Sequence, residues 1–123
     1  MRESLRKRFG TPEKKPRLRV ICATLGPGKA RLLSRIAETH SLSEAARTMK
    51  MSYKRAWQLI DAMNAAFRGP LVESVAGGKQ GGGSRLTALG TRVLGLYEEI
   101  CRRSVAASSR EMRRLHGLLK ELI

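Results

Sequence analysis

Two short helices separated by a tight turn constrain this chain more than any other feature of its sequence. Residues 41–64 (SLSEAARTMKMSYKRAWQLIDAMN) contain Ser41 and Ser52, each placed just before a run with helical periodicity. Serine is a preferred residue at that position. Glu44, three residues after Ser41, completes the pattern of a capping box. The joint between the two helices is only a few residues long, which is the spacing of a helix-turn-helix.

The second helix, expected over residues 52–67, has an apolar face and a polar face. Apolar residues recur at spacings of four, three and four and should face the core: Ala56, Ile60, Met63 and Phe67. The opposite face and the first turn, where a recognition helix usually meets base edges, carry donors suited to guanine, adenine and phosphate. We therefore predict these DNA-binding residues: Ser52, Tyr53, Lys54, Arg55 and Gln58. The open alternative is a basic helix face that is simply solvated.

An excess of positive charge points to a polyanionic partner. The chain carries 25 Lys+Arg against 10 Asp+Glu, a formal net charge of +15 over 123 residues. Such a field attracts nucleic acid first and an anionic membrane surface second. No apolar run approaches the roughly 18 residues that a membrane span needs, and the N-terminus lacks the apolar core of a signal peptide. We expect no membrane association and a cytoplasmic protein with one compact domain plus extensions.

The sequence offers no pattern typical of catalysis or of metal binding. Cys22 and Cys101 are far apart and, like His40 and His116, belong to no cluster with metal-ligand spacing. No nucleophile elbow, phosphate loop or pair of carboxylates with catalytic spacing is present. We therefore expect no enzyme activity, no metal and no other cofactor, and two buried free thiols in a reducing compartment.

The segments before the helix-turn-helix are a basic arm and two short elements. Residues 1–17 combine many basic residues with two prolines, which predicts a flexible arm. Such an arm can reach DNA phosphates or a minor groove, although a solubilising tail accounts for the composition equally well. Residues 18–25 are aliphatic and β-branched, which predicts a short strand. After residues 26–28, a support helix is expected, with its apolar face formed by Leu32, Leu33, Ile36 and Ala37.

A glycine-rich segment after the second helix predicts a wing. Residues 71–75 alternate as a strand does, and an extended run resumes at residues 85–87. Nucleotide-binding glycine loops are followed directly by a helix, whereas a strand follows here, so we prefer a β-hairpin. Glycines let a backbone lie close to the sugar-phosphate chain. The wing over residues 76–85 adds further predicted DNA-binding residues: Lys79, Gln80 and Arg85.

A long helix is expected over residues 88–123, capped by Thr87. Its first half carries apolar residues at three-four spacing: Leu89, Val93, Leu96 and Ile100. The pattern weakens through a serine-containing stretch and returns at Met112, Leu115, Leu119 and Leu122. One small winged domain cannot cover so long a seam, so we expect a homodimer joined through this helix. The alternative is that residues 110–123 fold back on their own domain.

Three segments resemble the N-terminal DNA-binding domain of the molybdate-responsive ModE regulators, a relative of the LysR-type winged helix-turn-helix. They are residues 26–64, residues 70–90 and the pair Leu96 and Tyr97; MSYKRAW and GGKQGGGSRLT are their most specific parts. The resemblance implies a homodimer with each recognition helix in a major groove and each wing beside it. It also implies that Trp57 serves packing as well as DNA contact.

The resemblance does not extend to the molybdate-binding domains of full ModE proteins. Nothing in the sequence resembles their oxyanion site, so we expect a DNA-binding module without its own molybdate sensor. Either a separate sensor protein controls it, or it binds DNA constitutively and its abundance regulates it.

These observations predict a mainly α fold, a winged helix-turn-helix with a short β-hairpin wing and a long C-terminal dimerisation helix. We divide the chain into a basic flexible arm (1–17), a winged helix-turn-helix (18–87) and a dimerisation helix (88–123). The predicted function is a sequence-specific transcription regulator, a dimer that reads an inverted repeat in double-stranded DNA with helix 52–67 and wing 76–85. The alternatives are an architectural protein that coats DNA with little specificity and a module whose last helix docks a separate sensor.

Overall fold

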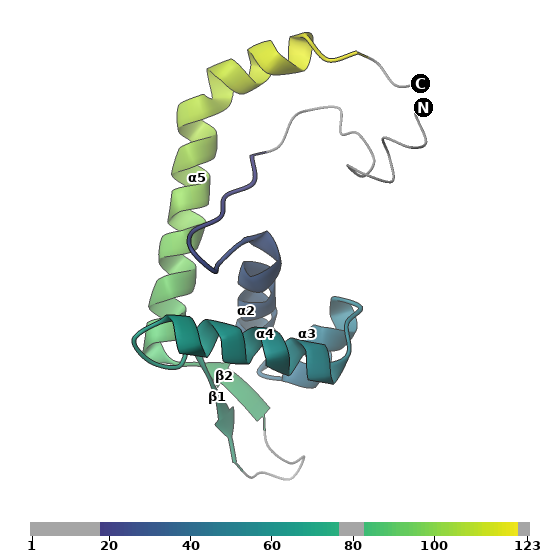
Figure 1. Ribbon diagram of the computed structural model, residues 1–123, viewed down its shortest axis with the longest axis vertical. Helices are drawn as coiled ribbons and strands as arrows, with labels where there is room; N and C mark the ends of the chain where they lie inside the picture. The colour runs from purple at the N-terminus through teal and green to yellow at the C-terminus, as the bar shows by residue number, and fades with distance from the viewer. Residues whose placement is uncertain (1–17, 77–82, 121–123) are drawn as a thin grey trace. The chain divides into compact units, whose positions relative to one another are not determined.

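The protein is mainly helical, with one two-stranded sheet among the residues that the structure describes. The computed structural model describes residues 18–76 and 83–120. Its elements are α2 (Pro27–Thr39), α3 (Leu42–Thr48), α4 (Tyr53–Ala66), β1 (Val72–Val75), β2 (Gly83–Leu86) and α5 (Ala88–Gly117) (Figure 1). One compact unit comprises Arg19–Ile100, and residues 101–120 belong to a second unit. The predicted winged helix-turn-helix is confirmed.

Helices α2, α3 and α4 pack around a core whose side chains are almost completely removed from water. Helix α3 contributes the small residues Ala45 and Ala46, which let its neighbours approach closely. The larger core residues come from the two flanking helices: Leu32, Leu33, Ile36, Ile60 and Met63. Burial of each large side chain stabilises the fold by roughly 1.5–3 kcal/mol. The predicted stripe is confirmed at Ala56, Ile60 and Met63, whereas its fourth residue, Phe67, is only half-buried at the C-cap of α4. Ala37, predicted on the core face of α2, is exposed.

The segment before α2 is a turn and not the predicted strand. The N–H of Cys22 donates to the carbonyl of Leu25 (2.8 Å) and the N–H of Leu25 donates to that of Cys22 (2.9 Å). Ala23 between them has a φ of 56°. A strand needs a neighbour for its backbone groups, and in the described chain this segment has only the isolated bridge. The Tyr97 hydroxyl of α5 holds the segment by donating to the carbonyl of Val20 (2.6 Å).

The turn between α3 and α4 is fixed by backbone hydrogen bonds. The N–H of Met51 donates to the carbonyl of Ala46 (3.0 Å), and the N–H of Lys50 donates to that of Arg47 (3.1 Å). This pair of bonds is a Schellman motif, whose left-handed residue is usually glycine. Here Lys50 adopts that conformation with a φ of 57°. The angle at which α4 leaves α3 is therefore set by the backbone of the turn.

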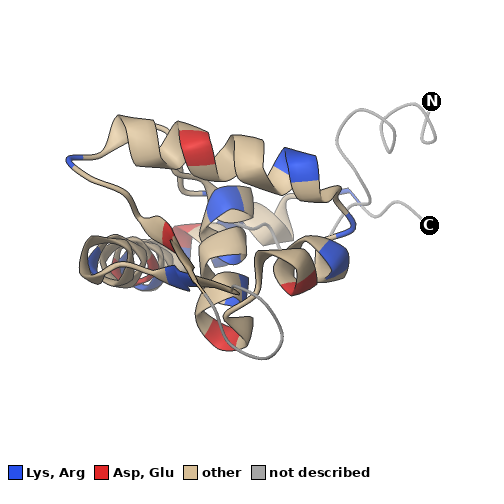
Figure 2. Ribbon diagram, turned by 90° about the horizontal axis from the view of Figure 1, so that it is seen from below, with Lys and Arg blue, Asp and Glu red and all other residues tan. Residues whose placement is uncertain are grey.

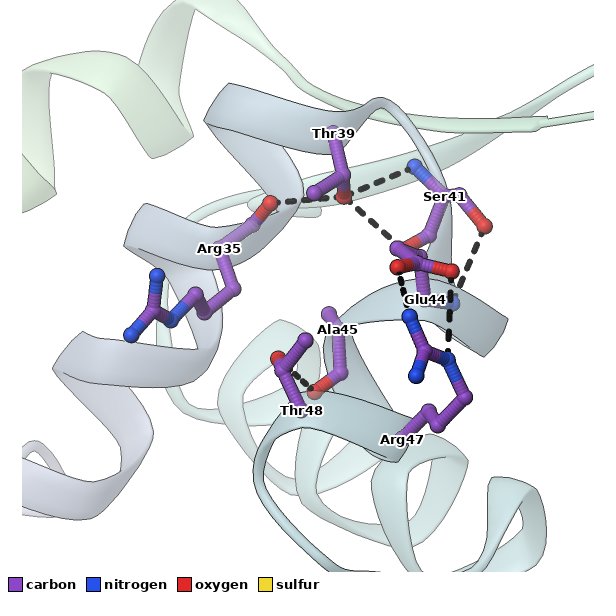
Figure 3. A network of polar contacts seen from close by, with 7 residues as sticks. All are labelled: Arg35, Thr39, Ser41, Glu44, Ala45, Arg47 and Thr48. Atoms are coloured by element: carbon purple, nitrogen blue, oxygen red, sulfur yellow. Dashed lines mark hydrogen bonds and ion pairs between the residues drawn. The ribbon is translucent and has the colours of Figure 1, made fainter.

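Only the serine half of the predicted capping box forms at the start of α3. The Ser41 hydroxyl accepts from the N–H of Glu44 (3.1 Å). The Glu44 carboxylate turns instead to Arg47, whose Nε lies 3.4 Å from Oε2 (Figure 3). The side-chain hydrogen bond that Arg47 donates to Glu44, and then the negative charge of Glu44, raise the pKa of Arg47. The N–H of Ser41 donates to the Thr39 hydroxyl (3.3 Å), so Thr39 satisfies the group that Glu44 was expected to bind.

Helix α5 begins against the end of the α4–β1 connection. The predicted cap is confirmed, because the Thr87 hydroxyl accepts from the N–H of Gly90 (2.9 Å). The same hydroxyl donates to the carbonyl of Pro70 (2.6 Å), and the N–H of Thr87 donates to that of Leu71 (2.9 Å). A Cβ on Gly90 would overlap the Leu71 carbonyl oxygen and lie 2.9 Å from its carbon. Glycine at position 90 thus permits the contact between α5 and this backbone.

The serine-containing stretch does not interrupt α5. The Ser108 hydroxyl donates to the carbonyl of Ser104 (2.7 Å), and the Ser109 hydroxyl donates to that of Ala106 (3.2 Å). Serine in a helix competes with the backbone for hydrogen bonds, and here the helix's own carbonyls accept these donors. The helix is continuous to Gly117, short of the predicted end at residue 123.

The cysteines are free but less buried than predicted. Both Cys22 and Cys101 are half-buried. Within residues 18–76 and 83–120, no three His, Cys, Asp or Glu side chains are arranged to hold a metal ion. In the same ranges, every helix is too short or too polar to cross a membrane.

Replacement of Gly90 by alanine should destabilise the protein by about 3 kcal/mol, the upper end of the cost of overpacking, because the new methyl group meets backbone that cannot rotate away. Gly95→Ala is the matched control in the same helix, since a Cβ there meets nothing within 4 Å. That change should stabilise the protein by about 0.5–1 kcal/mol. Chemical denaturation measures both, and equal changes at the two glycines would contradict the packing at Gly90.

Candidate nucleic-acid interface

The start of α4 carries the predicted DNA-binding residues on its solvent side. The Ser52 hydroxyl caps the helix by accepting from the N–H of Arg55 (3.0 Å). All five predicted residues of this helix are exposed: Ser52, Tyr53, Lys54, Arg55 and Gln58. The other side of the helix is fully buried at Ala56, Ile60 and Met63. Because one face is fixed in the core, the orientation of the donors on the other face is fixed as well.

Tyr53 and Trp57 form an aromatic pair at the start of α4. Their ring centroids lie 6.2 Å apart and the ring planes meet at 83°, an edge-to-face arrangement. Such pairs contribute about 0.5–1.5 kcal/mol beyond their buried area. Trp57 is half-buried and Tyr53 is 53% exposed. Trp57 therefore supports Tyr53, while the phenol of Tyr53 remains accessible.

The charge on α4 changes along its length. Lys54 and Arg55 lie near the N-terminal end, and the first acidic residue of the helix is the exposed Asp61 (Figure 2). The backbone N–H groups at a helix start add a partial positive charge. In the part of the chain that the structure describes, no hydrogen bond or ion pair engages the side chains of Lys54, Arg55 or Gln58. These donors are therefore available to a ligand.

The β1–β2 hairpin presents one face to the domain and the other to solvent. The strands are antiparallel, and Val72 pairs with Leu86 while Glu73 pairs with Arg85. Val72 and Ser84 are buried, whereas Arg85 is exposed and its Nε donates to Oε1 of Glu73 at 2.8 Å. The sequence therefore located the hairpin, but the ion pair of Arg85 was not foreseen. Two other predicted wing residues, Lys79 and Gln80, lie outside the described residues.

Asn64 connects α4 to the hairpin, a role that the sequence pattern did not predict. Its Oδ1 accepts from the N–H groups of Leu71 (2.8 Å) and Val72 (3.3 Å). Its Nδ2 donates to the carbonyl of Val72 (3.3 Å). The amide thus pairs with the backbone of β1 as a neighbouring strand would. The available signal was an amide side chain next to the core residue Met63, just before the chain reverses.

The hairpin has a second anchor at the junction of α2 and α3. The N–H of Ser84 donates to the carbonyl of His40 (3.0 Å). His40 ends α2 in a left-handed conformation with a φ of 55°. A Cβ on Gly83 would lie 2.6 Å from the same carbonyl oxygen, so the strand approaches closely because position 83 has no side chain. In Figure 1 the hairpin extends below α4. Its position relative to the helix is thus fixed through both strands.

Comparison with known proteins identifies relatives of the described unit. Residues 28–91, slightly more than half of the chain, match the family described as bacterial regulatory helix-turn-helix protein, lysR family. The chain is 41% identical over 80 residues to the molybdenum transport protein ModE of Azotobacter vinelandii, covering 65% of this chain and 30% of that protein. It is 43% identical over 74 residues to the transcriptional regulator ModE of Haemophilus influenzae, covering 60% of this chain and 29% of that protein.

A further relative is the DNA-binding transcriptional dual regulator ModE of Escherichia coli K12. The chain is 43% identical to it over 72 residues, which cover 58% of this chain and 28% of that protein. The chain thus spans less than a third of the length of these relatives. The family match covers the core helices, the hairpin and the start of α5.

Removal of the Asn64 amide should loosen the hairpin. Asn64→Ala leaves the N–H groups of Leu71 and Val72 without their acceptor, and we expect a loss of stability of about 1–3 kcal/mol. Asn64→Asp keeps the acceptor oxygen and should cost less. Ser74→Ala, at an exposed position of the same strand, is the control and should change stability by less than about 0.5 kcal/mol. Thermal and denaturant unfolding report the differences; equal losses for the two Asn64 variants would contradict the acceptor role.

Proposed function

The chain belongs to the LysR family of bacterial regulatory helix-turn-helix proteins, and we propose that it reads an inverted repeat in double-stranded DNA as a homodimer. Its winged helix-turn-helix is of the type found in sequence-specific DNA-binding transcription regulators. The observation that carries the proposal is that α4 has two opposite faces. One face exposes hydrogen-bond donors to solvent, and the other is completely buried at Ala56, Ile60 and Met63. A rigid helix presented in this way suits the major groove.

In this proposal the residues at the start of α4 divide into base readers and phosphate binders. Lys54 and Arg55 suit the acceptors of guanine, and the Gln58 amide suits adenine. Ser52, Tyr53 and the first N–H groups of α4 suit phosphate, which sets register without reading sequence. On the wing, the predicted contacts Lys79, Gln80 and Arg85 would bind the adjacent backbone. The arm 1–17 would add phosphate neutralisation, so affinity should fall steeply with salt.

The proposed dimer forms through α5. Gly90, Leu94 and Tyr97 contact the helix's own domain, whereas Leu96 is 57% exposed and Ile100 is 43% exposed. Leu96 and Ile100 belong to the predicted seam and lie on a different face from the buried residues. A second copy of α5 could cover this face. Two domains related by a twofold axis would match a symmetric operator.

We retain the division of the chain into an arm (1–17), a winged helix-turn-helix (18–87) and a dimerisation helix (88–123). We place the protein in the bacterial cytoplasm, where the DNA of such regulators lies. In our proposal these residues bind DNA and do not themselves bind molybdate. Addition of molybdate to the binding assay should therefore leave the affinity unchanged.

A second candidate function is that of an architectural protein with low sequence specificity, which the net charge of +15 favours. A footprint on long DNA separates the two functions. Discrete protected sites support the regulator, and continuous protection supports the coating protein.

Substitutions at the start of α4 should change base preference. Lys54→Ala and Gln58→Ala should each relax discrimination at particular operator positions by roughly 1–3 kcal/mol, whereas Lys79→Ala should weaken all sequences alike and lower the salt slope by about one. The measurement is binding to duplexes selected in vitro from a random library and to their single-base variants. Arg68→Ala, basic but beyond the end of α4, controls for lost charge. Equal losses on selected and random DNA for the α4 variants would show that these residues are not base readers.

Introduction of charge on the seam of α5 should separate the dimer. Burial of Leu96 and of Ile100 in the dimer should each stabilise it by roughly 1.5–3 kcal/mol. Leu96→Glu with Ile100→Glu removes this contribution and should raise the dimer dissociation constant more than about tenfold. Thr91→Glu adds one negative charge on another exposed face and should leave the dimer intact. Sedimentation at micromolar concentration is the measurement. An unmodified chain that sediments only as a monomer would reject the dimer.

A further inference from the structure

We propose that Glu73 is a positioning residue, which holds the guanidinium of Arg85 so that its terminal nitrogens face a DNA phosphate. This inference rests on the proposed function, because it assumes that the wing lies beside the DNA backbone. It adds an acidic residue to a surface otherwise considered for its basic residues alone. It also gives a role to the ion pair that the sequence did not predict.

The geometry of the ion pair leaves the outer edge of Arg85 available. Glu73 and Arg85 are direct cross-strand partners in the hairpin. The contact runs from Nε of Arg85 to Oε1 of Glu73 at 2.8 Å. A guanidinium has five donors in one plane, and Nε lies on its inner side. The two terminal nitrogens form the opposite edge, which suits the paired oxygens of a phosphate.

The hairpin holds this pair on its solvent face. The Arg85 side chain is 60% exposed and that of Glu73 is 43% exposed. The two outer edges of the hairpin are fixed to the domain by the hydrogen bonds between Asn64 and the backbone of Val72 and between the N–H of Ser84 and the carbonyl of His40. An arginine already held in one orientation loses less conformational freedom on binding. The carboxylate therefore prepares the guanidinium for phosphate.

A positioning role for Glu73 predicts the opposite effect on DNA affinity from the one that its charge alone predicts. A carboxylate near DNA repels the phosphates, so a purely electrostatic account says that removal of Glu73 tightens binding. If Glu73 acts through Arg85, its removal instead weakens binding. Once Arg85 is absent, only the repulsion remains, and removal of Glu73 should tighten binding or leave it unchanged.

A double-mutant cycle in the full chain tests this prediction. The variants are Glu73→Ala, Arg85→Ala and the double substitution, and the probe is the duplex enriched from a random library by the unmodified chain. We expect Glu73→Ala to weaken binding about threefold to tenfold, Arg85→Ala to weaken it at least as much, and Glu73→Ala to cause no further loss in the Arg85→Ala background. Tighter binding by Glu73→Ala alone would overturn the proposal, as would equal losses in both backgrounds.

Arg85→Lys provides a second test that keeps the charge and perturbs folding least. A lysine ammonium is a point charge without the planar fork, so we expect a loss of affinity similar to that of Arg85→Ala. Unchanged affinity would overturn the proposal, because charge alone would then suffice. Lys54→Ala measured in parallel separates this inference from the proposed function. If Lys54→Ala alters base preference but the Glu73 variants do not behave as expected, the regulator proposal holds and the role of Glu73 is rejected. If no duplex is enriched from the library, both proposals are rejected.

Discussion

The side-chain amide of Asn64 substitutes for a missing strand, and the position of the wing depends on it. A hairpin of two four-residue strands has little stability of its own. It becomes fixed because Asn64 pairs with the backbone of Leu71 and Val72 on one side and His40 pairs with Ser84 on the other. Because hydrogen bonds are directional, these contacts both stabilise the hairpin and determine its position.

The presentation of the donors on α4 rests on the opposite face of the same helix. Ala56, Ile60 and Met63 are completely buried, and Lys54 and Gln58 point away from them. The turn before the helix adds a second constraint, because the left-handed Lys50 sets the direction in which α4 starts. The energy that orients the polar face therefore comes from hydrophobic burial and from the backbone of the turn. The polar residues themselves contribute little to it.

Much of this fold could be predicted from local patterns, and the differences have physical causes. The caps at Ser41, Ser52 and Thr87 and the stripe on α4 depend on residues within a turn or two of each other. The predicted strand at residues 18–25 failed because a strand depends on a partner that local sequence does not reveal. The Glu44 carboxylate binds Arg47 and not the N–H of Ser41, because the Thr39 hydroxyl already accepts from that N–H.

In the candidate site too, local patterns predicted the features of one helix but not the contacts between separate segments. The exposure of Lys54 and Gln58 followed from helical periodicity, whereas the Asn64 contacts and the Glu73–Arg85 pair join residues far apart in the chain. Their recognition required the register of the hairpin. The backbone of Leu71 has one more consequence: its N–H donates to Asn64, its carbonyl accepts from the N–H of Thr87, and that carbonyl packs against Gly90. We therefore expect the base of the hairpin and the first turn of α5 to open to solvent together, with one exchange barrier for their amide protons.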